Sequence, residues 1–413
     1  MRAEIITIGD ELLIGQVVDT NSAWLGQMLN KYGIKIHRIN SISDNSEEIK
    51  TQLTECLQRS ELIIMTGGLG PTKDDITKKT LLEYFNMGWR LDEAVMAQLV
   101  AFYKNRGREM LEVNKLQADL PDGCKTLFNF WGTAPGMWFD IGEKVLISMP
   151  GVPYEMKNIF EFNTLPLIAE KFKQPKLFHK TLVTINVPES ILAKRIEHIE
   201  DALPSYVKLA YLPNWNMVRL RFTGTEQIGE DIVAKIDSIT NEIHQILGDS
   251  IVAFKDLSMA EIAFELLSEK NKTLSVAESC TGGYISHQMT QISGASKVFV
   301  GSVISYSNSV KHHQLGVEST LFETVGAVSE QVVTQMVEGV RERLDTDYAI
   351  AVSGVAGPNG GSEDKPLGTV VIGVCCKDKT LVRTWHFIGD RMNVIGRSNN
   401  MAFDMLRKLI LEN

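Results

Sequence analysis

The chain has 413 residues, of which 44% are hydrophobic and 23% charged, so it is a globular protein too long for one core, and two or three domains are expected. A formal net charge of −9, without a basic tract, argues against a nucleic-acid-binding surface. The five cysteines lack disulfide or zinc spacing, no signal peptide is recognisable and no apolar run reaches membrane-spanning length, so we expect a cytoplasmic protein that contacts no membrane.

The first segment, about residues 1–170, alternates short apolar runs with amphipathic stretches. Strands are predicted at 4–8, 34–42, 62–65 and 145–149, and helices at 21–31, 47–57 and from about 154. Because strands that alternate with helices usually pair in parallel, this series predicts a parallel sheet with helices on both faces.

The middle segment, residues 175–252, has a different order of elements. Strands are predicted at 180–187, 207–212 and 217–223, and helices at 189–199 and 226–247. This order is typical of a small α+β module. The segment holds no dense cluster of Gly, Asp, Ser or His, so we expect it to have a structural or connecting role.

The third segment, residues 256–413, opens with a capping box in which Ser258 and Glu261 start a helix. Strands are predicted at 273–276, 298–306, 348–352, 367–375 and 381–387, and helices at 259–267, 284–289, 329–344 and 393–411. The whole chain is therefore predicted to be α/β, with two α/β sandwich domains of mostly parallel or mixed sheets joined by the small α+β module.

A strand-to-helix turn in the third segment carries Ser279, Cys280 and Thr281, followed by two glycines that permit close approach of a backbone or ligand. Such turns place nucleophiles or anion-binding amides, because a helix begins with free N–H groups and a positive partial charge. The alternative is a glycine-rich turn in which Ser or Thr merely caps the helix.

Two further strand ends in this segment carry polar groups, the stretch from Tyr306 to Lys311 and the glycine-rich loop from Gly354 to Gly361. Ligands of open α/β sheets bind at such ends. A serine can be activated by a lysine whose pKa is lowered by desolvation, and loop amides can stabilise an oxyanion. These groups fit an amide or ester hydrolase without a His/Asp pair, in which Asn308 orients the leaving amide.

Each of these side chains also has a plainer interpretation. Taken singly, Lys311 is more often a solvated surface lysine, and Tyr306 a strand-end tyrosine that fills the edge of a core. Cys280 is more often a small buried hydrophobic residue than a nucleophile.

The three motifs, 277–283, 306–311 and 354–358, resemble those of the CinA C-terminal domain, a nicotinamide mononucleotide deamidase. The resemblance implies that Ser279 is the nucleophile, with Cys280 as the alternative, and that Lys311 and Tyr306 handle its proton. Nicotinate mononucleotide and ammonia are the implied products, and no cofactor is implied. The implied substrate-binding residues are Thr281, Gly282, Gly283, Asn308, Gly354, Ala356, Gly357, Arg391 and Arg397. The chain has Ile395 where the family often has a second arginine.

Two acidic, glycine-rich clusters follow strands of the first segment, at 9–15 and 66–77. Glycines permit close approach to phosphate, and carboxylates suit a hard divalent cation that bridges a diphosphate. Neither cluster is a Walker loop or a GxGxxG fingerprint. Asp74 and Asp75 are explained equally by charges that complement a helix N-terminus.

These clusters, with 132–136 and 150–155, resemble the MoaB/MogA-like molybdopterin-binding domain of the same CinA family. The resemblance implies a metal-dependent ADP-ribose pyrophosphatase, whose divalent metal is held by Asp10, Asp75 and Glu155. The implied substrate-binding residues are Gly67, Gly68, Gly70, Thr72 and Asn21. Related domains bind a pterin, and the motif does not choose between pterin and ADP-ribose.

The leading hypothesis is therefore a two-activity enzyme of pyridine-nucleotide recycling that binds small nucleotides, and the resemblance adds a homodimer. One alternative is a molybdopterin-binding protein. Another is a non-catalytic, competence-related scaffold that binds nucleotides.

Overall fold

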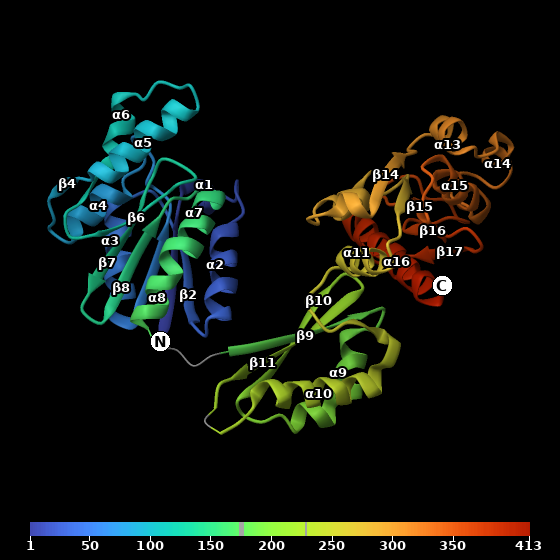
Figure 1. Ribbon diagram of the computed structural model, residues 1–413, viewed down its shortest axis with the longest axis horizontal. Coiled ribbons are helices and arrows are strands. Elements are labelled where there is room, and N and C mark those ends of the chain that lie inside the picture. The colour runs from blue at the N-terminus through green and yellow to red at the C-terminus, as the bar shows by residue number, and fades with distance from the viewer. Residues whose placement is uncertain (173–176, 228) are drawn as a thin grey trace. The chain divides into compact units, whose positions relative to one another are not determined.

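The computed structural model describes residues 1–172, 177–227 and 229–413 (Figure 1). The chain folds into two compact units, Met1–Phe178 with Thr225–Glu230, and His179–Gly224 with Asp231–Asn413. Both units are α/β structures with mixed sheets, as predicted. Within the described ranges, no helix combines the length and the apolar character needed to cross a bilayer.

The first unit is built on a six-stranded sheet of order β2-β1-β3-β8-β7-β6. Its strands are β1 (Arg2–Ile8), β2 (Lys35–Ile42), β3 (Leu62–Thr66), β6 (Lys125–Leu127), β7 (Gly136–Ile141) and β8 (Lys144–Met149). The first four strands in the sheet order are parallel, whereas β7 and β6 are antiparallel. The expected parallel sheet is thus extended by an antiparallel pair.

Helices cover both faces of this sheet because its central strands are apolar on both sides. One face packs against α2 (Thr20–Lys31), α7 (Pro153–Ile159) and α8 (Leu165–Lys171). The other packs against α3 (Ser46–Arg59), α4 (Thr77–Tyr84) and α5 (Glu93–Asn105). The remaining α-helices and strands are α1 (Asp10–Leu13), β4 (Trp89–Leu91), α6 (Glu112–Lys115) and β5 (Asp119–Pro121).

The middle module has a four-stranded sheet of order β10-β11-β9-β12 with two helices. Its elements are β9 (Leu177–Ile185), α9 (Glu189–Asp201), β10 (Val207–Asn214), β11 (Met217–Thr225), α10 (Ile232–Leu247) and β12 (Ile251–Ala253). The predicted helix at 226–247 is wrong at its start. The Asp231 side chain accepts a hydrogen bond from the backbone N–H of Ala234 and caps the helix there, so α10 begins at Ile232.

The third segment forms a five-stranded sheet of order β14-β13-β15-β16-β17. Its strands are β13 (Leu274–Glu278), β14 (Phe299–Ile304), β15 (Tyr348–Gly354), β16 (Thr369–Cys375) and β17 (Thr380–His386). Its helices are α11 (Met259–Glu269), α12 (Tyr284–Thr290), α13 (Asn308–Leu315), α14 (Ser319–Thr324), α15 (Glu330–Arg343) and α16 (Arg391–Glu412). β13 pairs in parallel with both β14 and β15.

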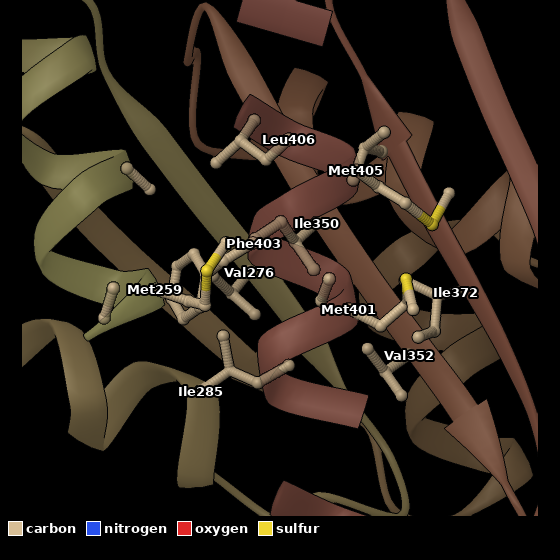
Figure 2. Close-up of a cluster of buried hydrophobic side chains, with 14 of the residues drawn as sticks. Met259, Val276, Ile285, Ile350, Val352, Ile372, Met401, Phe403, Met405 and Leu406 are labelled. Atoms are coloured by element: carbon tan, nitrogen blue, oxygen red, sulfur yellow. The ribbon is translucent and has the colours of Figure 1, made fainter. Parts of the chain in front are cut away.

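Alternating residues of this sheet face two cores. Figure 2 shows the core on one face, where Met259 of α11, Ile285 of α12 and Phe403 of α16 lie with Val276 of β13. α15 covers the opposite face. The first core continues into the middle module, because Met217 of β11 belongs to the same cluster. The middle module and the third segment therefore share one hydrophobic core.

The parallel pairing brings three strand ends together at one edge of this sheet. Glu278, the last residue of β13, lies beside Ile304 of β14 and Val352 of β15. The segments that follow these strands carry the three motifs of the sequence, so the fold places the motifs side by side.

The position of α13 depends on a glycine of α15. A Cβ atom at Gly339 would lie 2.0 Å from the backbone oxygen of Leu315, the last residue of α13. We expect Gly339→Ala to lower the free energy of unfolding of the second unit by about 1–3 kcal/mol, because α13 must move away. Denaturant titration followed by circular dichroism measures this change.

Gly26→Ala is the matched control, since Gly26 lies within α2 with open space around its Cα atom. Alanine there should be neutral or stabilising by up to about 1 kcal/mol. Equal unfolding curves for the two variants would contradict the close packing of α13 on α15.

Candidate functional site

The turn after β13 places Ser279 at the edge of the sheet. The Ser279 backbone N–H donates to the Val352 carbonyl at 2.9 Å, which fixes the residue beside β15. Gly282 and Gly283 have φ angles of +60° and +102°, which glycine adopts without strain, and α12 begins at Tyr284. The Ser279 side chain is thus held between two strands and a helix start.

Glu278 closes the start of α12. Its fully buried carboxylate accepts hydrogen bonds from the N–H groups of Gly283 and Ile285, at 3.0 and 3.1 Å. It also accepts from the backbone N–H and hydroxyl of Ser286, at 2.9 and 2.5 Å. The expectation that the first amides of this helix are free for a substrate anion is therefore wrong for these three. The sequence signal for this role was a carboxylate directly before a glycine-rich turn.

Lys311 points from α13 to the nucleophile candidate. Its Nζ atom donates to Ser279 Oγ at 3.0 Å, to the Ser305 carbonyl at 2.7 Å and to the Tyr306 carbonyl at 3.4 Å. The residue is 1% exposed, so the solvated-surface interpretation is wrong. Burial lowers the pKa of Lys311 to about 8, because the charged ammonium loses its hydration.

Cys280 and Thr281 differ from Ser279 in their surroundings. Cys280 belongs to the hydrophobic core, and burial raises its pKa to about 12, so the thiol stays protonated near neutral pH. Thr281 is buried, and within the described residues its hydroxyl has no hydrogen-bond partner. It does not cap α12, whose N-cap is Gly283. The geometry therefore favours Ser279 as nucleophile and leaves the Thr281 hydroxyl available to a ligand.

Arg391, the first residue of α16, joins the other two strand-end segments. It donates to the Gly357 carbonyl at 2.8 Å and to the Tyr306 hydroxyl at 3.3 Å. Tyr306 is 62% exposed, so it does not fill a core edge. Its hydroxyl accepts a hydrogen bond from Arg391, whereas its backbone carbonyl accepts one from Lys311. This differs from the expectation that the Tyr306 hydroxyl shares proton handling with Lys311.

The other expected binding residues surround these groups. Gly354 allows close strand packing, since a Cβ atom there would lie 2.8 Å from the Thr369 oxygen. Ala356 is buried, and Asn308 is exposed at the start of α13. Arg397 lies six residues after Arg391 in α16, about 9 Å along the helix axis. Its Nε atom is buried and has no partner within the described part of the chain.

The first unit has an open cavity of about 390 Å³ at the carboxyl ends of its parallel strands. Five predicted residues line it: Gly67, Gly68, Gly70, Asp75 and Glu155. Three further acidic residues line it: Glu11, Asp44 and Asp74. Glu11 and Asp74 belong to the two acidic clusters of the sequence, whereas Asp44 was not singled out, and the strand order brings it to the same cavity.

The remaining predicted residues of this unit lie nearby. Asp10 is exposed, and its N–H donates to Asp44 at 3.3 Å. The Thr72 N–H donates to Asp75 at 2.9 Å. Asn21 lines a neighbouring cavity of about 100 Å³ and donates to the Gly151 carbonyl at 2.7 Å. Asn21 therefore holds a loop that borders both cavities.

The predicted metal ligands do not form a ligand set by themselves. In residues 1–172, 177–227 and 229–413, no three His, Cys, Asp or Glu side chains lie close enough together to hold a metal ion. Burial raises the pKa of Glu155, which accepts from Asn129 at 2.6 Å, and burial with neighbouring carboxylates raises that of Asp44. One or two carboxylates plus phosphate oxygens suffice for Mg²⁺, so the residues fit a metal that arrives with its substrate.

The buried amine of Lys311 should make stability depend on pH. Its folded pKa of about 8 lies below the ordinary value of 10.5, so the unfolded chain binds more protons between these values. We expect the stability of the protein relative to Lys311→Met to rise as the pH increases from 8 to 10.5, and the burial cost to be complete below pH 8. Denaturant titrations of both proteins across this range measure the difference.

Lys297→Met is the control, because Lys297 is exposed and should give a difference that does not change over this window. If the Lys311→Met and native stabilities ran parallel from pH 8 to 10.5, the buried amine would not have a lowered pKa.

Three stretches of the chain match known families. Residues 4–170 match the family described as a probable molybdopterin binding domain, and residues 179–253 match the KH domain of damage-inducible protein CinA. Residues 256–410 match the CinA C-terminal domain. The third match contains Ser279, Lys311 and Arg391.

Relatives of similar length match along the whole chain. A CinA-like protein of Flavobacterium psychrophilum is 42% identical over 418 residues, 100% of this chain and 99% of that protein. A putative competence-damage inducible protein of Caldicellulosiruptor bescii is 37% identical and covers 100% of both. The crystal structure of CinA from Thermoplasma acidophilum is 31% identical with a TM-score of 0.37, covering 41% of this chain and 98% of that one. The full-length matches show that the chain belongs to the CinA family.

Proposed function

We propose that the second unit hydrolyses the carboxamide of nicotinamide mononucleotide to nicotinate mononucleotide and ammonia. The observation that carries this proposal is the Lys311 amine, 3.0 Å from Ser279 Oγ and with its pKa lowered to about 8. A lysine with that pKa is neutral in about a tenth of molecules at pH 7, and the neutral amine is a base. The substrate, nicotinamide mononucleotide, is inferred from the resemblance of the three motifs to those of the CinA C-terminal domain.

The pair supports a two-step amide hydrolysis. Neutral Lys311 uses two N–H groups toward the Ser305 and Tyr306 carbonyls, which leaves its lone pair to accept the Ser279 proton. Ser279 Oγ then bonds to the carboxamide carbon. When the C–N bond breaks, the Lys311 ammonium returns its proton to the leaving nitrogen, which departs as ammonia and leaves an ester on Ser279.

Water completes the cycle by attacking the ester carbon while Lys311 accepts its proton. The bond from that carbon to Ser279 Oγ breaks, Oγ regains a proton from Lys311, and nicotinate mononucleotide leaves. We assign oxyanion stabilisation to the N–H groups of Cys280 and Thr281, neither of which donates to Glu278. The Arg391 guanidinium, which contacts the other two strand-end segments at Gly357 and Tyr306, suits the substrate phosphate.

Ser279→Ala should lower the rate of ammonia release from nicotinamide mononucleotide by at least about 10³-fold, because the nucleophile is removed. Cys280→Ala should keep the rate, since its protonated thiol packs in the core. A coupled ammonia assay on purified full-length protein measures both variants. An inactive Cys280→Ala beside a fully active Ser279→Ala would mean that the nucleophile is the neighbouring thiol, and an inactive native protein would refute the deamidase.

For the first unit, we propose a metal-dependent hydrolysis of ADP-ribose at the cavity of Asp75 and Glu155. These carboxylates would hold a divalent cation together with the diphosphate, and the cation would make a phosphorus atom more electrophilic toward water. Water would bond to that phosphorus while its bond to the bridging oxygen breaks, which gives AMP and ribose 5-phosphate.

Gly67 and Gly68 have φ angles of +115° and +64°, and Cβ atoms there would collide with the Ile8 carbonyl and the Thr77 hydroxyl, so glycine is what allows this loop to line the cavity. The acidic side chains that line the cavity would repel a diphosphate, which explains why its binding would need the cation.

Asp75→Asn should abolish AMP formation from ADP-ribose, because the amide keeps the size of the side chain but loses its charge. EDTA should have the same effect on the native protein. Asp249→Asn, at an exposed position, is the charge-matched control and should behave as native. AMP formation that survives both EDTA and Asp75→Asn would remove the metal and this residue from the proposal.

A pterin is the second candidate ligand for this cavity, because residues 4–170 match a family described as a probable molybdopterin binding domain. Competition between ADP-ribose and a pterin phosphate for the cavity distinguishes the two. The described cysteines are all free, which supports our proposal of a cytoplasmic protein. The homodimer stays a prediction from the family resemblance.

A further inference from the structure

The tip of the β10–β11 hairpin of the middle module contacts α12 and α16, the helices next to the proposed deamidase site. We propose that Trp215, at this tip, is a positioning residue that sets the geometry of the Ser279 turn and of Arg391. The inference rests on the proposed deamidase for its kinetic consequence, but its structural part can be tested without any activity. By this inference the middle module positions residues of the deamidase site, in addition to connecting two domains.

The hairpin tip adopts an unfavourable backbone conformation. Asn214 pairs with Met217, so Trp215 and Asn216 form a two-residue turn, and Trp215 has a φ angle of +54°. A bulky residue in the left-handed region is energetically unfavourable and persists where its surroundings hold it. Glycine or asparagine would adopt this turn with less strain. The tryptophan is therefore explained by the contacts of its side chain and not by the turn.

The indole ring lies against α16. A Cβ atom at Gly396 would lie 2.3 Å from Cε2 of Trp215, so the ring rests directly on the helix backbone. Only glycine at that position leaves room for it. Gly396 is five residues from Arg391 on the same helix, and Arg391 contacts both Gly357 and Tyr306. The ring therefore fixes the helix that carries the proposed phosphate ligand.

The same ring also contacts α12. The Trp215 and Tyr284 rings meet edge to face, with centroids 6.4 Å apart and an interplanar angle of 76°. Tyr284 is the first residue of α12, and its N–H donates to the Thr281 carbonyl at 3.0 Å. Trp215 thus touches the helix that begins at the nucleophile turn.

A chain of asparagines fastens the hairpin in this place. Asn216 donates to the Asn186 side chain at 3.0 Å, and Asn400 of α16 donates to Asn216 at 3.1 Å. Asn186 also has a left-handed φ angle, +59°, and donates to Met401 Sδ at 3.8 Å. Asn400 lies four residues after Gly396, so both contacts are on one face of α16. The hairpin therefore contacts both α12, which follows the Ser279 turn, and α16, which carries Arg391.

A purely structural role would change stability alone, so the experiment measures geometry and rate together. The full-length native protein is compared with Trp215→Ala, Trp215→Phe and Tyr211→Ala. Tyr211 lies on β10 of the same module and bonds to Glu200 at 2.7 Å, which makes it the matched aromatic control. Hydrogen exchange measures the exchange rates of the backbone amides of Gly283, Ile285 and Ser286, which donate hydrogen bonds to Glu278.

We expect Trp215→Ala to speed the exchange of these three amides and to lower kcat/KM for ammonia release about tenfold or more, well below the temperature of unfolding. Trp215→Phe should restore most of both properties, and Tyr211→Ala should match the native protein. Gly396→Ala should act like Trp215→Ala, and the double variant should lose no more than either single one, because both remove the same contact.

If Trp215→Ala does not fold, Gly396→Ala takes its place in both measurements. Native exchange of the three amides in the folded variant would overturn the inference, whatever the rate. A native protein that releases no ammonia would refute the proposed deamidase instead, and the exchange result would then decide the positioning role by itself.

Discussion

The contact between the Lys311 amine and the Ser279 hydroxyl is the interaction on which the proposed activity of the second unit depends. A lysine that is 1% exposed has lost its water, and its hydrogen-bond partners are a hydroxyl and two carbonyl oxygens, all uncharged. Such an environment stabilises the neutral amine at the expense of the ammonium, which lowers the pKa to about 8. Burial therefore turns an ordinary cation into a base, and the same burial keeps Cys280 a thiol. Burial thus explains why Lys311 can act as the base while Cys280 stays a protonated thiol and Ser279 is left as the nucleophile.

The fold maintains this contact from several sides. The parallel register of β13, β14 and β15 brings the Ser279 turn beside the segment that leads into α13. Gly339 lets α15 pack on the end of α13, and Glu278 occupies the first amides of α12. The middle module shares the core and presses Trp215 against α12 and α16. A two-domain view, with a passive connector, does not account for that ring.

Much of this arrangement follows from local sequence signals. The alternation of strands and helices, and the place of Ser279 and Lys311 just after two strands, could be predicted because each rests on short-range periodicity. The contacts that join distant segments could not. Arg391 donates a hydrogen bond to Tyr306, 85 residues earlier in the chain. The acidic residues of the first cavity, Glu11, Asp44 and Asp74, come from separate segments. The predicted start of α10 is wrong because Asp231 caps the helix, so that it begins at Ile232, six residues after the predicted start at 226. Glu278 was visible in its motif, but its partners depend on how the turn folds back.

The central claim is that Ser279 forms an ester with the substrate. Rapid acid quench of the native protein during turnover of nicotinamide mononucleotide, followed by proteolysis and mass spectrometry, tests it most directly. The account predicts the mass of the nicotinoyl nucleotide on the peptide that contains Ser279, located by fragmentation on the serine itself and not on Cys280. An adduct on Cys280, or turnover under single-turnover conditions with the Ser279 peptide unmodified at every time point, would contradict it.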